Sequence, residues 1–89
     1  MIMLDYFIIY AKVKCGFCVK AINKMNEHGL DHALVLIDKA PDLFEDVKSE
    51  YDHHTVPIIL KVNKISKEKE FIGGCDDFMS WLNEQGYEC

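Results

Sequence analysis

The sequence contains no long hydrophobic run. Its apolar opening segment is interrupted by Asp5 and follows no basic segment, which is unlike a secretory signal peptide. No other apolar run approaches the roughly 20 residues that a helix needs to cross a bilayer. We therefore expect a soluble, cytoplasmic protein that does not contact a membrane.

The sequence also lacks a cluster of basic residues, and its net charge is -5. Proteins that bind nucleic acid neutralise the phosphate backbone with concentrated positive charge. This charge distribution predicts no nucleic-acid partner.

A second pair of closely spaced cysteines is missing as well. Cys15 and Cys18 are separated by two residues, whereas Cys75 and Cys89 stand apart from them and from each other. A zinc ribbon needs two close pairs, and the histidines lack ligand spacing, so no metal site is expected. Without a secretory signal, a disulfide scaffold is disfavoured, and a redox-cycling pair in a reducing compartment fits better. We interpret the four histidines as surface or packing residues: His28, His32, His53 and His54.

The composition is that of an ordinary folded protein. The chain has 89 residues, of which 49% are hydrophobic and 28% charged, and it contains no repeat, low-complexity tract or linker. This length suits one small core, so we expect one domain over residues 1–89.

Hydrophobic patterning predicts the order of the elements in the first half. Residues 6–10 form an apolar, β-branched and aromatic run typical of a central strand covered on both faces, and residues 33–37 repeat that pattern. Between these runs, Cys18, Ala21, Ile22 and Met25 recur at helical spacing, and Gly29 is placed to end the helix.

The second half adds a helix, a hairpin and a last helix. Pro41 suits the first turn of a helix that ends near residues 52–53. Residues 58–62 and 70–72 read as antiparallel strands, and the last helix begins at residues 76–77 with Phe78, Trp81 and Leu82 facing inward. The order is β-α-β-α-β-β-α. It predicts an α/β fold with a four-stranded mixed sheet flanked by helices.

The close cysteine pair lies where the first strand gives way to the first helix. There, Cys15 would face free backbone N–H groups and the positive end of the helix dipole, with Lys14 adjacent and Lys12 nearby. Those groups favour the thiolate, which is the attacking form in disulfide exchange. Cys18 belongs to the buried stripe yet remains within disulfide reach. We predict that Cys15 is the nucleophile and Cys18 the resolving thiol, against the alternatives of metal binding or two idle thiols.

These motifs together resemble the glutaredoxin family, and the resemblance covers nearly the whole chain. It is carried by Cys15-Gly16-Phe17-Cys18, by Lys12 three residues earlier, by Thr55-Val56-Pro57, and by Gly73-Gly74-Cys75-Asp76. The resemblance implies a thioredoxin fold and a glutathione-dependent thiol–disulfide oxidoreductase.

The resemblance also implies a role for each matching residue in binding glutathione. Val56 would pair its backbone with the cysteinyl part, and Pro57, beside Thr55, would be cis. Lys12 would attract the glycyl carboxylate. The helix start at Cys75 and Asp76, with Gly74 before it, would hold the γ-glutamyl end. Phe17, by its own chemistry, offers a flat apolar wall beside the reacting sulfur and completes the candidate binding residues.

Gly16 and Phe17 depart from the Pro and Tyr of common dithiol glutaredoxins and are similar to monothiol members of the family. Two alternatives therefore stay open beside the enzyme. One is a dimer that shares a glutathione-ligated iron–sulfur cluster, and the other is an electron donor dedicated to a reductase such as ribonucleotide reductase. For the enzyme we expect a monomer that acts in electron transport and cell redox homeostasis. Its partners would be glutathione and disulfide-containing or glutathionylated proteins.

Overall fold

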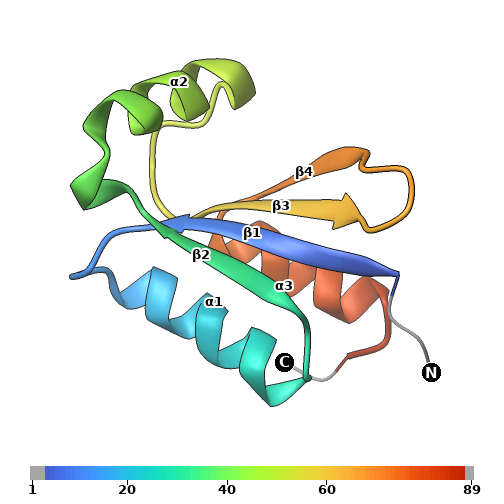
Figure 1. Ribbon diagram of the computed structural model, residues 1–89. Helices are drawn as coiled ribbons and strands as arrows, with labels where there is room; N and C mark the ends of the chain where they lie inside the picture. Colours follow the sequence, from blue (N-terminus) through green and yellow to red (C-terminus); the bar gives the residue numbers. More distant parts are fainter. Residues whose placement is uncertain (1–3, 88–89) are drawn as a thin grey trace.

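The expected element order is confirmed in the computed structural model, which describes residues 4–87 (Figure 1). The elements are β1 (Asp5–Ala11), α1 (Gly16–Glu27), β2 (His32–Leu36), the short 3-10 helix η1 (Ile37–Lys39), α2 (Pro41–Tyr51), β3 (Ile58–Asn63), β4 (Lys69–Gly73) and α3 (Cys75–Glu84). No helix within these described residues is both long enough and apolar enough to span a membrane.

The four strands form one mixed sheet in the order β2-β1-β3-β4. β1 runs parallel to β2 and antiparallel to β3, so that Ile9 lies between Leu34 and Ile59. β4 pairs antiparallel with β3 through the hairpin. α1 and α3 cover one face of the sheet and α2 lies on the other (Figure 1), which confirms the predicted α/β arrangement with a four-stranded sheet flanked by helices.

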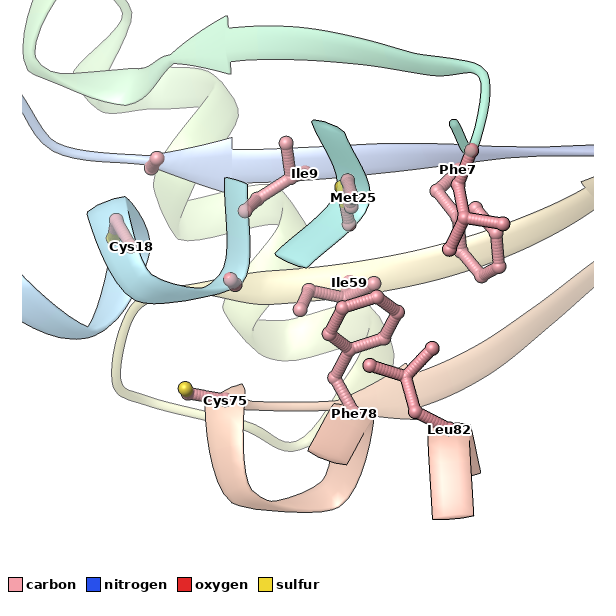
Figure 2. Packing of buried hydrophobic residues seen from close by; sticks show 11 residues of the cluster. Phe7, Ile9, Cys18, Met25, Ile59, Cys75, Phe78 and Leu82 are labelled. Carbon is pink, nitrogen blue, oxygen red and sulfur yellow. The ribbon is translucent and has the colours of Figure 1, made fainter. Parts of the chain in front are cut away.

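The hydrophobic core lies between the sheet and the pair α1 and α3. Phe7, Phe78 and Leu82 are fully buried in it, and Phe7 meets the Phe78 ring edge to face at 5.6 Å between centroids. Figure 2 shows Cys18 and Cys75 at one end of this cluster and Phe7 and Leu82 at the other. Burial of each large side chain contributes about 1.5–3 kcal/mol, so the core fixes the starts of α1 and α3 relative to the sheet.

The face under α2 is covered less completely than the residue pattern suggests. In β1 the residues facing this side, Tyr6, Ile8 and Tyr10, are only partly buried. Within α2 itself Val47 is the buried residue. The two faces of β1, both of which were expected to be covered, are therefore covered unequally. The reason is that α2 contributes a narrower apolar contact than α1 and α3 together.

The interpretation of residues 33–37 as a second buried strand was wrong in part. β2 is an edge strand in which no residue is buried, and Leu34 is 48% exposed. Ile37 is buried, but it belongs to η1. An edge strand has a neighbour on one side only, so its side chains keep access to solvent although their composition matches that of a covered strand.

Candidate functional site

The two close cysteines lie at the start of α1, as predicted. Cys15 is the N-cap residue with extended backbone, and its Sγ accepts a hydrogen bond from the backbone N–H of Cys18 at 3.2 Å. Cys15 is half-buried, whereas Cys18 is only 1% exposed. An amide N–H aimed at sulfur at a helix N-terminus favours negative charge there, and it is the more accessible of the two sulfurs that has this contact.

The Cys18 thiol is held in its protonated form. Burial, followed by the side-chain hydrogen bond with Cys15, raises the pKa of Cys18 from 9.0 to about 12, although a backbone hydrogen bond from Lys12 acts in the opposite direction. The two sulfurs therefore differ in access, and Cys18 keeps its proton near neutral pH. The division into an attacking Cys15 and a resolving Cys18 stays a prediction.

The lysines before the cysteines were expected to support the Cys15 charge. Lys12 and Lys14 are exposed, and the Lys12 ammonium lies over the ring of Phe44 in α2, 5.1 Å from its centroid. The hydrogen-bond partner of the Cys15 sulfur is the backbone N–H of Cys18, and support of its charge by the lysines stays a prediction.

A groove of about 400 Å³ opens beside the cysteine pair. It gathers the residues that the glutathione resemblance selected, apart from Lys12, and it adds two that sequence reasoning missed, His53 and Asp77. Its lining is Phe17, His53, Thr55, Val56, Pro57, Gly74, Cys75, Asp76 and Asp77.

One wall of the groove is the loop that joins α2 to β3. The Val56–Pro57 peptide bond is cis, as the resemblance implied, and Pro57 is fully buried. Val56 is half-buried in the lining. Since Pro57 has no N–H, the backbone at this strand start leaves space for an added extended chain.

The opposite wall is the start of α3. Gly74 is the N-cap residue, and its N–H donates to the Asp77 Oδ2 at 3.1 Å. Asp76 is exposed in the first turn, where an acidic side chain is favoured by the helix dipole. Asp77 is thus committed to its own helix start, whereas the Asp76 side chain is exposed in the groove lining.

Cys75 lines the same groove but is only 5% exposed. Burial raises the pKa of its thiol. Cys75 is therefore a packed, protonated residue at the edge of the site, while Cys89 lies outside the described residues.

His53 belongs to the groove, although its sequence context suggested only a surface or packing residue. Its Nε2 lies 3.4 Å from the Thr55 Oγ1, and its ring meets the ring of Phe71 in β4 edge to face at 5.6 Å. Its closeness to Thr55 in the sequence was the one available signal, because its other neighbours come from distant segments.

Comparison with known protein families agrees with the resemblance seen in the sequence motifs. The family model described as Glutaredoxin matches residues 7–64, a span that holds both close cysteines and the cis-proline loop but stops before α3. No curated protein is similar enough in sequence to be matched.

Solved structures resemble the chain over most of its length. The dithiolic glutaredoxin 2-C-Grx1 of Trypanosoma brucei brucei is 27% identical with a TM-score of 0.70, over 92% of this chain and 80% of that one. A buckwheat glutaredoxin–glutathione complex is 20% identical with a TM-score of 0.73, over 92% and 71%. The glutaredoxin-like NrdH-redoxin of Escherichia coli is 15% identical with a TM-score of 0.66, over 94% and 99%. The architecture is the thioredoxin fold of these proteins.

Proposed function

Because this chain belongs to the glutaredoxin family, it is a thiol–disulfide oxidoreductase, and we propose that it draws its electrons from glutathione and reacts through Cys15 and Cys18. The observation that carries the proposal is the Cys15 sulfur at the N-cap of α1, where it accepts the Cys18 N–H beside a groove of about 400 Å³.

The first step is an exchange of one disulfide for another. The Cys15 thiolate attacks one sulfur of a substrate disulfide, a bond forms between these sulfurs, and the substrate S–S bond breaks. The departing sulfur leaves as a thiolate and takes a proton from solvent. With a glutathionylated protein as substrate, the product is a protein thiol, and glutathione stays bound to Cys15.

The second step releases the group attached to Cys15. A second glutathione attacks the mixed disulfide, which frees Cys15 and yields oxidised glutathione. Alternatively Cys18 loses its proton and attacks the Cys15 sulfur of the mixed disulfide. The bond to glutathione breaks, glutathione leaves as a thiolate, and an intramolecular disulfide closes that two further glutathione molecules later reduce. Burial of Cys18 disfavours its thiolate, which favours the first route near neutral pH.

The groove supplies complementary groups for both ends of glutathione. The cysteinyl part would pair with the backbone of Val56, and the γ-glutamyl end would lie at the α3 start beside Asp76, whose carboxylate suits an ammonium group. Lys12 lies on the α2 side, where its ammonium suits the glycyl carboxylate. The glutathione complex of the buckwheat glutaredoxin supports this assignment.

In this function the protein is a cytoplasmic monomer. It reduces protein disulfides and glutathione mixed disulfides, and it contributes to electron transport and cell redox homeostasis.

A second candidate is an electron donor dedicated to one reductase, such as ribonucleotide reductase. It is supported by the likeness to the NrdH-redoxin, a glutaredoxin-like protein with a thioredoxin-like activity profile. The match covers 99% of the length of that protein. Such a donor would receive electrons from thioredoxin reductase in place of glutathione.

The two candidates are separated by supplying each reductant in turn. In one assay the oxidised protein receives NADPH, glutathione and glutathione reductase. In the other it receives NADPH and thioredoxin reductase without glutathione. A mixed glutathione disulfide is the substrate in both assays, and NADPH consumption is measured. We expect turnover with the glutathione system, none with thioredoxin reductase, and none with Cys15→Ser. Turnover by thioredoxin reductase alone would favour the second candidate and reject glutathione dependence.

A further inference from the structure

We propose that His53 is a specificity-determining residue of the groove, which donates a hydrogen bond to the γ-glutamyl carboxylate of bound glutathione and makes that binding depend on pH. The inference rests on the proposed use of glutathione and adds a residue and a regulation to that site.

The His53 ring is held in place from three sides. Thr55 of the same loop lies 3.4 Å from Nε2, Phe71 of β4 contacts the ring edge to face, and Gly74 lies at the α3 start. A Cβ atom built on Gly74 would be 3.4 Å from the His53 Nε2, so this nitrogen lies directly against the N-cap of α3. A ring packed in this way loses little further freedom when a ligand arrives.

The charges of the groove explain why an imidazole matters at this position. Asp76 and Asp77 give the described lining two carboxylates, and His53 is the one side chain in that lining that can become positive. The Lys12 ammonium faces Phe44 instead. An α-amino acid end carries both an ammonium and a carboxylate. Asp76 complements the ammonium, whereas the carboxylate, near two acids, needs the donor that His53 supplies.

The groove residues around His53 differ in whether they carry charge. Thr55 and Phe71 carry no charge, and neither does Phe17 of α1. Burial raises the pKa of Cys75, so its thiol stays protonated through neutrality. The remaining charged groups of the lining are the carboxylates of Asp76 and Asp77.

Imidazole side chains exchange a proton between about pH 5 and pH 8, and both nitrogens donate only in the protonated form. A carboxylate ligand therefore binds more tightly at the acidic end of this range. The loss of one charge-assisted hydrogen bond corresponds to about a tenfold change in affinity.

The experiment uses S-methylglutathione, a thioether that cannot exchange with Cys15 and has no thiol of its own to titrate. Its dissociation constant is measured by calorimetry at about pH 6 and pH 8 for the full chain, for His53→Gln and for His54→Gln. His54 is the matched control, because its side chain is 70% exposed, lies 3.4 Å from Asp52 and is outside the groove lining.

We expect the wild-type protein and His54→Gln to bind several-fold more tightly at the lower pH. His53→Gln should bind about tenfold more weakly at that pH and lose most of the pH dependence. With S-methylcysteinylglycine, which lacks the γ-glutamyl residue, the variants should be indistinguishable. In wild-type protein the His53 ring resonances should shift on addition of S-methylglutathione, a readout independent of any variant's folding.

The outcomes separate this inference from the proposed function. If S-methylglutathione fails to bind wild-type protein, the proposed use of glutathione fails and His53 has no such role. If it binds but His53→Gln keeps the wild-type affinity and pH profile, the role of His53 alone is overturned. Unshifted His53 resonances in the bound state would overturn it as well.

Discussion

The ammonium group of Lys12 lies over the ring of Phe44, 5.1 Å from the ring centroid. The same ring also receives Lys48, whose Nζ is 4.4 Å from the centroid and 2.8 Å from the Glu45 carboxylate. An aromatic face attracts a cation by about 0.5–1 kcal/mol at exposed sites. Phe44 therefore positions Lys12 toward α2, at the side of the site assigned to the glycyl carboxylate.

Replacement of Phe44 by leucine should weaken the use of glutathione without slowing the chemical step. We expect KM for glutathione to rise by about two- to fivefold, the equivalent of the lost cation–π attraction, while kcat stays unchanged. Phe44→Tyr keeps the aromatic face and should restore the wild-type KM. Steady-state kinetics with a glutathionylated peptide measure both parameters. Equal KM values for the leucine and tyrosine variants would show that the ring does not position Lys12.

Cys15 and Cys18 should contribute differently to activity on a glutathione mixed disulfide and on a protein disulfide. Cys15→Ser removes the accessible sulfur and should reduce every exchange to the uncatalysed background. Cys18→Ser should retain much of the activity on a glutathione mixed disulfide, because a second glutathione can release the product, but should lose the route that ends in an intramolecular disulfide. Parallel assays on a glutathionylated peptide and on a protein disulfide test this division. Full activity of Cys15→Ser on either substrate would contradict the assignment of the nucleophile.

The high pKa of Cys18 predicts a selective pattern of alkylation. In a Cys89→Ser background, iodoacetamide near neutral pH should label Cys15 rapidly and leave Cys18 and Cys75 unlabelled until the protein unfolds, because burial raises the pKa of both thiols. Mass spectrometry of quenched time points identifies the labelled residue. Labelling of Cys18 in folded protein at a rate similar to Cys15 would be inconsistent with this geometry.

The raised pKa of Cys18 also predicts how the free energy of unfolding changes in alkaline solution. A thiol whose pKa is higher in the folded state than in the unfolded state stabilises the fold fully below the unfolded value, and this contribution is lost as the pH rises toward the folded value. For Cys18 that interval runs from 9.0 to about 12. The reduced protein should therefore lose free energy of unfolding above pH 9, and Cys18→Ala should lose less over the same interval. Urea denaturation of both proteins across the interval measures the difference, and parallel curves would exclude Cys18 as the cause.

Local sequence was sufficient to predict the placement of the cysteine pair. Cys15 and Cys18 take their positions from one helix start, and the residues that define this start are adjacent in the chain. The strands and helices also followed from hydrophobic periodicity. The edge position of β2 could not be read in this way, because an apolar run has the same composition whether or not a further strand pairs beside it.

The positions of the Lys12 and His53 side chains depend on contacts between distant segments. Closeness to the cysteines suggested that Lys12 supports the Cys15 charge, but α2 offers its ammonium an aromatic ring. The position of His53 depends on Phe71 and Gly74, which reach it only after β4 and α3 have packed. Such contacts are set by the tertiary arrangement, and no local pattern encodes them.

Gly73 should be the least replaceable glycine beside the site. Its φ is +122°, a conformation that other residues rarely adopt, and a Cβ there would collide with the Asp77 carboxylate that caps the Gly74 N–H. Gly73→Ala should therefore lower the free energy of unfolding by about 1–3 kcal/mol. Gly16→Ala is the matched control, because a Cβ at Gly16 would meet nothing within 4 Å and alanine is favoured in a helix. Urea denaturation of the two variants measures the contrast. Equal stabilities would mean that the turn into α3 tolerates a side chain, and that the α3 wall of the groove does not depend on this glycine.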